Sequence, residues 1–157
     1  MSQPRQSRAL IIVNSNFCSS DHDVVLGTRK GAKREAEKLS RILSRLNYKV
    51  KLVHNKTAKE INDLYQQERC CEHGEYFVSI ISSHGEEGVI FGCDMEPVKL
   101  TQIFQTLSSE RCPVLTKIPK IFFIQVTQPL DDNLIPFLLS SCRIRLAQAR
   151  GLRLLPG

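Results

Sequence analysis

The sequence predicts an α/β fold with a mainly parallel sheet and helices on both faces. Short, continuous apolar runs recur over the first 126 residues, and the segments between them have the spacing of amphipathic helices. Continuous apolar runs are typical of strands that are covered on both sides. Strands joined through helices need crossover connections, which make the strands parallel and place the helices against the sheet.

The first half of the chain contains two expected strands and two expected helices. Residues 9–13 are a continuous apolar run, and residues 48–53 alternate as a strand does. Between them, apolar residues at helical spacing are Ala32, Ala36, Leu39, Leu43 and Leu46. Thr57 and Glu60 form a capping box that opens a second helix, because each side chain can cap the backbone N–H of the other.

The second half continues this alternation. Residues 76–82 form a third apolar strand, and residues 89–92 and 97–100 have the pattern of a small hairpin. A third helix is indicated by Leu100, Ile103, Phe104 and Leu107. Residues 121–126, Ile-Phe-Phe-Ile-Gln-Val, are the last expected strand.

The composition changes after Thr127, which divides the chain into three parts. Every lysine lies at or before Lys120, and no strand–helix alternation follows residue 127. We expect a short polar N-terminus at residues 1–8, one α/β domain at 9–127, and an unrelated, disordered Leu/Arg-rich tail at 128–157. With no strand expected in the tail, residues 121–126 should form an open, aggregation-prone sheet edge.

Charge and cysteine content narrow the function classes. The net charge is +6, but no block of five or six like charges occurs and few aromatic residues accompany the basic ones, so nucleic-acid binding is not expected. No long apolar segment predicts a signal peptide or a membrane span, and prolines and glycines in the tail disfavour a membrane-surface helix. The six cysteines lack C-x-x-C spacing, which favours reduced thiols in the cytosol or nucleus and no zinc site. We expect a cytoplasmic protein with no metal and no cofactor.

Three candidate site residues lie at or after the ends of expected strands. His84 follows the third strand, Gln125 lies near the end of the last one, and Arg29 lies in the loop after the first. Because ligands of parallel sheets bind beyond the carboxyl ends of the strands, these side chains can converge at one edge. Position alone favours a simpler interpretation, in which His84 is an exposed turn residue and Arg29 a solvated loop residue.

Two segments resemble the large subunit of a caspase, and the resemblance extends over residues 9–125. These segments are Ser-His-Gly-Glu-Glu-Gly at 83–88 and Pro-Lys-Ile-Phe-Phe-Ile-Gln at 119–125. The resemblance implies that His84 is the catalytic imidazole and that the Gly85 N–H is an oxyanion-hole donor. It also implies that Arg29 and Gln125 hold the carboxylate of a substrate aspartate.

The nucleophile of the family is missing. Its Q-A-C-x-G motif reads Gln-Val-Thr-Gln-Pro at residues 125–129, so Thr127 stands at the cysteine position. A threonine hydroxyl beside a lone histidine stays protonated. In addition, residues 128–157 cannot be aligned with the small subunit of a caspase.

We therefore expect a truncated, catalytically inactive caspase-like pseudoenzyme. It would act as a decoy that binds caspases or caspase substrates, or would be a non-functional gene product, with the tail derived from a retained intron or from a selected sequence. The alternative is a cysteine endopeptidase that cleaves after Asp in proteolysis and apoptosis and whose active form comes from another transcript.

Overall fold

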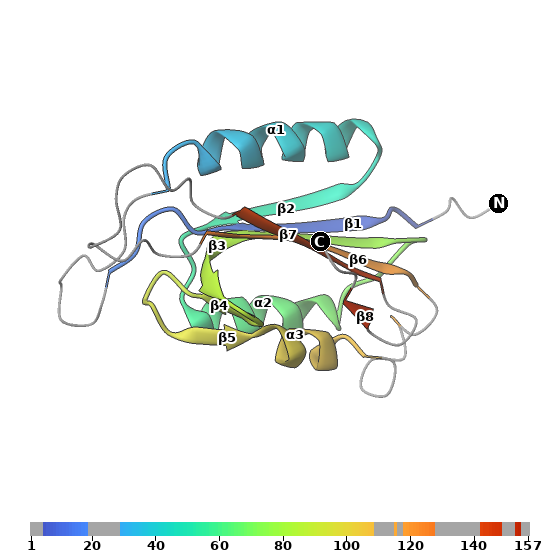
Figure 1. The fold of residues 1–157 in the computed structure, drawn as a ribbon. Helices are drawn as coiled ribbons and strands as arrows, with labels where there is room; N and C mark the ends of the chain where they lie inside the picture. The colour runs from blue at the N-terminus through green and yellow to red at the C-terminus, as the bar shows by residue number, and fades with distance from the viewer. Residues whose placement is uncertain are drawn as a thin grey trace.

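The computed structural model describes residues 5–18, 29–108, 115, 118–127, 142–148 and 153–154. For Thr127 and the last two ranges it describes the backbone alone. Figure 1 shows a central sheet with one helix, α1, on one face and two helices, α2 and α3, on the other. The predicted α/β class with flanking helices is confirmed.

The helices and strands follow the predicted order closely. In chain order they are β1 (Arg8–Val13), α1 (Ala32–Arg45), β2 (Lys49–His54), α2 (Ala58–Glu68), β3 (Phe77–Glu86), β4 (Val89–Phe91), β5 (Pro97–Lys99), α3 (Leu100–Thr106), β6 (Lys120–Thr127), β7 (Cys142–Gln148) and β8 (Arg153–Leu154). The capping box is present, with the Glu60 N–H donating to Thr57 Oγ1 at 3.2 Å and the Thr57 N–H to Glu60 Oε1 at 3.1 Å. None of the described helices is long and apolar enough to cross a membrane.

The sheet has a parallel part and an antiparallel part. Its strand order is β2-β1-β3-β6-β7-β8. The first four strands run parallel, whereas β7 pairs antiparallel with β6, and β8 antiparallel with β7. The β4–β5 hairpin attaches to the end of β3. Because β1, β3 and β6 are parallel neighbours, their carboxyl ends lie at one edge of the sheet.

The expectation of an open edge at β6 is wrong. β7 pairs with β6 from Ile121 to Thr127, all of β6 except its first residue, so both sides of β6 are paired. The part of the tail that the structure describes, Cys142–Gln148 and Arg153–Leu154, is strand, which differs from the disorder expected there. Strand–helix alternation, the pattern that indicated the earlier strands, does not extend past residue 127, so the sequence did not predict β7. A domain boundary at residue 127 stays a prediction.

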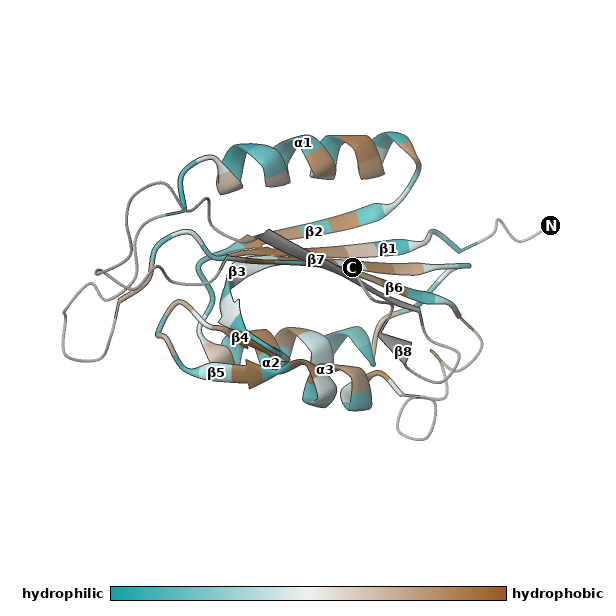
Figure 2. Cartoon of the chain, in the orientation of Figure 1, coloured by the Kyte–Doolittle hydropathy of each residue, from teal (hydrophilic) through white to brown (hydrophobic). Residues whose placement is uncertain are grey.

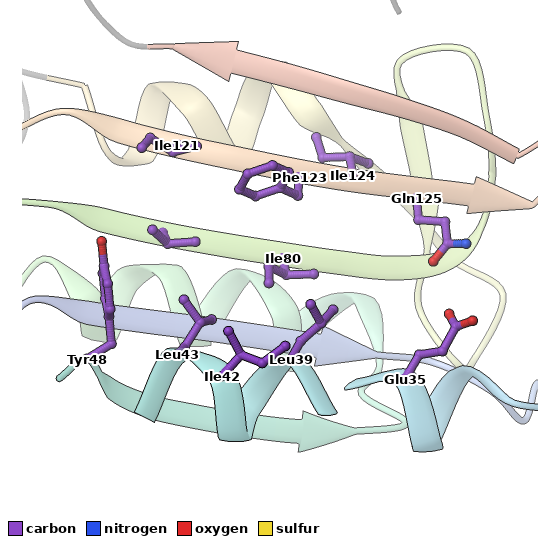
Figure 3. Close-up of a pocket in the computed structure, with 11 residues that line it drawn as sticks. Glu35, Leu39, Ile42, Leu43, Tyr48, Ile80, Ile121, Phe123, Ile124 and Gln125 are labelled. Carbon is purple, nitrogen blue, oxygen red and sulfur yellow. The ribbon is translucent and has the colours of Figure 1, made fainter. Parts of the chain in front are cut away.

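The two faces of the sheet are covered unequally. Figure 2 shows hydrophobic residues along the central strands. The larger core cluster lies between the sheet and α2 and α3, whereas the buried residues of the α1 cluster are Ile11, Val13, Ala32 and Ala36. Beside α1, a groove of about 580 Å³ is lined mainly by apolar side chains of α1, β3 and β6. In Figure 3, Leu39, Ile42 and Leu43 of α1 lie across this α1 groove from Phe123 of β6.

A buried ionic cluster lies at the opposite, N-terminal edge of the sheet. Arg8 donates two hydrogen bonds to the Glu68 carboxylate, from Nε and from Nη2, both at 3.0 Å. The Glu68 side chain is only 3% exposed. His73 Nε2 donates to the Glu68 carbonyl oxygen at 2.7 Å and lies 3.6 Å from the Glu68 carboxylate. The cluster joins the start of β1 to the end of α2.

Acidification below about pH 6.5 is expected to destabilise the fold through His73. Burial lowers the pKa of His73; the Glu68 carbonyl and carboxylate oppose this effect, while Arg8 and Lys120 add to it. The unfolded chain therefore takes up the proton more readily than the folded chain. The stability due to neutral His73 is complete above the unfolded pKa of about 6.5 and is lost as the pH falls towards the folded value.

Urea midpoints measured between pH 7.5 and 5.5 test this dependence. His73→Gln keeps a hydrogen-bond donor but cannot titrate, so its midpoint should fall less than that of the unmodified chain over the same interval. Equal slopes for the two proteins would contradict the assignment to His73.

Candidate functional site

His84 and Thr127 are neighbours across two parallel strands. The pairing of β3 with β6 places Ser82 opposite Gln125 and His84 opposite Thr127. Neighbouring strands lie about 4.8 Å apart, so the backbones of His84 and Thr127 are adjacent. The structure thus brings the histidine and the threonine of the nucleophile position to the same edge of the sheet.

His84 lies within a strand rather than in the expected turn. β3 continues to Glu86, because Ser83 and His84 still pair with β6 and the next two residues, Gly85 and Glu86, pair with β4. The Ser-Ser-His-Gly-Glu sequence has the composition of a turn, but two different partner strands hold it extended. The chain reverses only afterwards, where Gly88 adopts a φ of 73°.

The imidazole of His84 packs against an aromatic ring that the sequence analysis missed. Phe17, from the segment after β1, places its ring centroid 4.7 Å from that of His84, with an interplanar angle of 56°. His84 is 6% exposed and Phe17 is 2% exposed. This contact restricts the rotation of the imidazole. The only feature of the sequence that indicates the contact is an aromatic residue in a polar loop.

Asn14 is a second residue that the sequence analysis missed. It is fully buried directly after β1, and its backbone N–H donates to the Ser82 carbonyl at 2.8 Å. Its Nδ2 donates to the Phe91 carbonyl at 3.1 Å, and its Oδ1 accepts from the Lys56 N–H at 2.9 Å. Its own carbonyl accepts from Arg29 Nη1 at 3.1 Å. Asn14 therefore ties β1, β3, β4 and the loop before α2 together beneath the site.

Arg29 and Gln125 are both at this edge. The Arg29 N–H donates to the Ser15 carbonyl at 2.9 Å, which fixes the arginine beside the end of β1. Gln125 accepts from Ser82 Oγ at 3.4 Å and lies at the end of the α1 groove (Figure 3). The structure thus gathers Arg29, His84 and Gln125 near the strand ends, and their catalytic and carboxylate-binding roles stay predictions. In the described part of the chain, no group of three His, Cys, Asp or Glu side chains could hold a metal ion.

Gly85→Ala is expected to push β4 away from β3. A β-carbon at residue 85 would overlap the Val89 carbonyl oxygen and lie 3.0 Å from Val126 Cγ1. Overpacking of this kind costs roughly 1–3 kcal/mol, which should appear as a lower urea midpoint with an unchanged slope. The control is Gly88→Asn, because residue 88 has open space and asparagine tolerates a positive φ. If both variants lost equal stability, packing at Gly85 would not be the cause.

The structure is an α/β sheet in which His84, near the end of β3, lies in register with Thr127, the last residue of β6. The caspase domain family matches residues 6–143, and the chain belongs to the caspase family. The match includes part of the region after residue 127.

Three relatives illustrate the similarity. Caspase-8 of Mus musculus is 30% identical over 125 residues, which cover 76% of this chain and 26% of the relative. Caspase-7 of Gallus gallus is 30% identical over 127 residues, covering 80% of this chain and 40% of the relative. Caspase-3 of Bos taurus is 32% identical over 127 residues, covering 80% and 45%. The matched part of the chain thus spans between a quarter and less than half of the length of these relatives.

Proposed function

We propose that this chain is a catalytically inactive member of the caspase family that acts in the cytoplasm by binding caspases or caspase substrates. One observation carries the inactivity: the residue in register with His84 on the adjacent strand is Thr127. None of the four parallel strands contains a cysteine, and Cys142, which pairs with Thr127 from β7, lies one strand further from His84. A neutral threonine hydroxyl is a weak nucleophile, and the enzymes that use threonine activate it with its own N-terminal amine.

The α1 groove supports the binding part of the proposal. Leu39, Ile42 and Phe123 line it, and these side chains are 39%, 51% and 40% exposed. Exposed apolar side chains that gather in one groove are typical of protein–protein contact sites. We therefore assign the contact with a caspase to this groove.

Biolayer interferometry with the full chain tests the binding. Caspase-8, caspase-7 and caspase-3 are immobilised in turn, and we expect the chain to bind at least one of them. Ile42→Asp should weaken that binding at least about tenfold, because it places a charge in the apolar contact. Leu46→Asp is the matched control, since Leu46 is 64% exposed but does not line the groove.

Two results would overturn the proposal. The first is no binding to any of the three caspases or to a caspase substrate protein. The second is turnover of an Asp-containing fluorogenic peptide that disappears in His84→Ala. The second result would favour the alternative, a cysteine-type endopeptidase acting in proteolysis and apoptosis.

A further inference from the structure

Two cysteines from distant parts of the sequence meet beside the site. Cys18 follows β1, one residue after Phe17, and Cys93 lies in the connection between β4 and β5. The Cys18 N–H donates a hydrogen bond to the Cys93 carbonyl oxygen at 2.9 Å. Both thiols are free; Cys18 is exposed and Cys93 is partly exposed.

Covalent geometry limits the distance between the two residues. The N–Cα bond is about 1.46 Å, and a carbonyl oxygen lies about 2.4 Å from its own Cα. With the 2.9 Å hydrogen bond between them, the two Cα atoms are at most about 6.8 Å apart. Disulfides span Cα distances of about 4.4–6.8 Å, so this pair lies within their range.

Two further cysteines of the described loops and turns, Cys70 and Cys71, lie at the opposite edge of the sheet. Cys70 and Cys71 follow the end of α2, beside the Glu68 that contacts the start of β1. Cys18 and Cys93 lie near the other ends of the strands. The fold therefore singles out one pair among these four cysteines.

We propose that Cys18 and Cys93 form a site of reversible disulfide formation beside His84, with a peroxide or a small-molecule disulfide as the oxidant. This site is independent of the proposed binding function.

The two thiols differ in reactivity, which sets the order of the steps. Burial, followed by the carboxylates of Asp94 and Glu60, raises the pKa of the Cys93 thiol, and a smaller contribution comes from Cys18. The exposed Cys18 therefore reacts first with hydrogen peroxide: its sulfur gains one oxygen as the O–O bond breaks and water leaves. The Cys93 sulfur then displaces that oxygen as a second water, so that two thiols and one peroxide give one disulfide and two waters.

The disulfide would join the segment that contacts His84 to the β4–β5 connection. The first carries Phe17, whose ring packs on the imidazole, and in the second the Cys93 N–H also donates to the Lys56 carbonyl at 2.8 Å. Oxidation would therefore fix the Phe17 ring over His84. It would also close a loop of about 75 residues, which should raise the Tm by roughly 5–15 °C.

Peptide mapping of the full chain tests the pair. The chain is treated with hydrogen peroxide, remaining thiols are alkylated, and trypsin and Glu-C are used together under non-reducing conditions. Cleavage after Arg8, Arg29, Glu87 and Lys99 places Cys18 in residues 9–29 and Cys93 in residues 88–99, each as the single cysteine of its fragment. We expect these two fragments to be linked and to separate on addition of dithiothreitol.

Variants separate this outcome from general oxidation. Cys18→Ser and Cys93→Ser should each lose the linked fragment and the rise in Tm, whereas the matched control Cys70→Ser/Cys71→Ser should keep both. The same comparison with oxidised glutathione distinguishes the two classes of oxidant. Recovery of Cys18 and Cys93 as alkylated thiols with both oxidants, or linkage of either one mainly to another cysteine, would overturn the proposal.

Discussion

The Thr127→Cys variant is expected to gain a reactive thiol without gaining peptidase activity. Residue 127 is in register with His84, and an adjacent imidazole can accept the proton of a thiol and so activate it. At pH 7 the new thiol should therefore react with iodoacetamide about tenfold faster than in Thr127→Cys/His84→Ala. Fragment mass spectrometry after brief alkylation measures the rate at residue 127 itself.

Turnover should stay absent because a nucleophile alone does not make the active site. The family motif has a glycine two residues after its cysteine, whereas this chain has Pro129, which offers no N–H. Loss of preorganised donors typically costs a factor of about 10² to 10³ in rate for each group. If Thr127→Cys cleaved an Asp-containing peptide as fast as an active caspase, the inactivity would rest on residue 127 alone. Equal alkylation of the single and double variants would contradict the placement of His84.

The Glu68→Gln variant is expected to lose about 3 kcal/mol of stability, or roughly 6–12 °C in Tm. The amide can replace the shape of the carboxylate but not its charge. Arg8, which now donates two 3.0 Å hydrogen bonds to Glu68, would remain as a largely buried cation without a counter-ion. Thermal unfolding followed by circular dichroism measures the change.

Two controls identify the buried charge as the cause. Arg8→Met/Glu68→Leu removes both partners and should be clearly more stable than Glu68→Gln, because no uncompensated charge is left. Glu60→Gln removes a carboxylate from the exposed pair with Lys56, where the separation is 3.7 Å, and should leave the Tm almost unchanged. A double variant no more stable than Glu68→Gln would show that the cluster does not act through charge.

The sequence was sufficient for the elements whose signal is local. Residues 9–13 are apolar because β1 is a central strand with neighbours on both sides, and the structure places β1 between β2 and β3. The Thr57–Glu60 capping box needs only four residues, and it occurs as predicted. Periodicity likewise predicted α1, whose buried residues Ala32 and Ala36 are four positions apart.

The features that the sequence did not reveal depend on contacts between distant residues. β3 extends through His84 because β6 and β4 supply partners from later in the chain. Arg8 and Glu68 are 60 positions apart, and Asn14 donates a hydrogen bond to Phe91, far along the chain. No local sequence pattern therefore indicates either contact. β7 was missed for the same reason: its pairing with β6 is visible only in three dimensions.

The candidate site was predictable in part. The rule that parallel strands share a carboxyl edge placed Arg29, His84 and Gln125 together, and the structure brings all three to that edge. The same rule could not predict the roles of Phe17 and Asn14, which contact the site from the segment after β1. A polar or aromatic residue in a loop has no periodic partner, so its importance appears only through its contacts.

Covalent labelling tests the central claim, catalytic inactivity, most directly. The full chain is incubated with a peptidyl-Asp fluoromethyl ketone, which alkylates an activated caspase nucleophile, and its intact mass is recorded beside that of His84→Ala. A matched probe with Asn in place of Asp controls for general alkylation of exposed thiols. We predict the same low level of labelling for both proteins and both probes. An adduct that requires both His84 and the Asp of the probe would contradict the account, because it would reveal a working nucleophile in this chain.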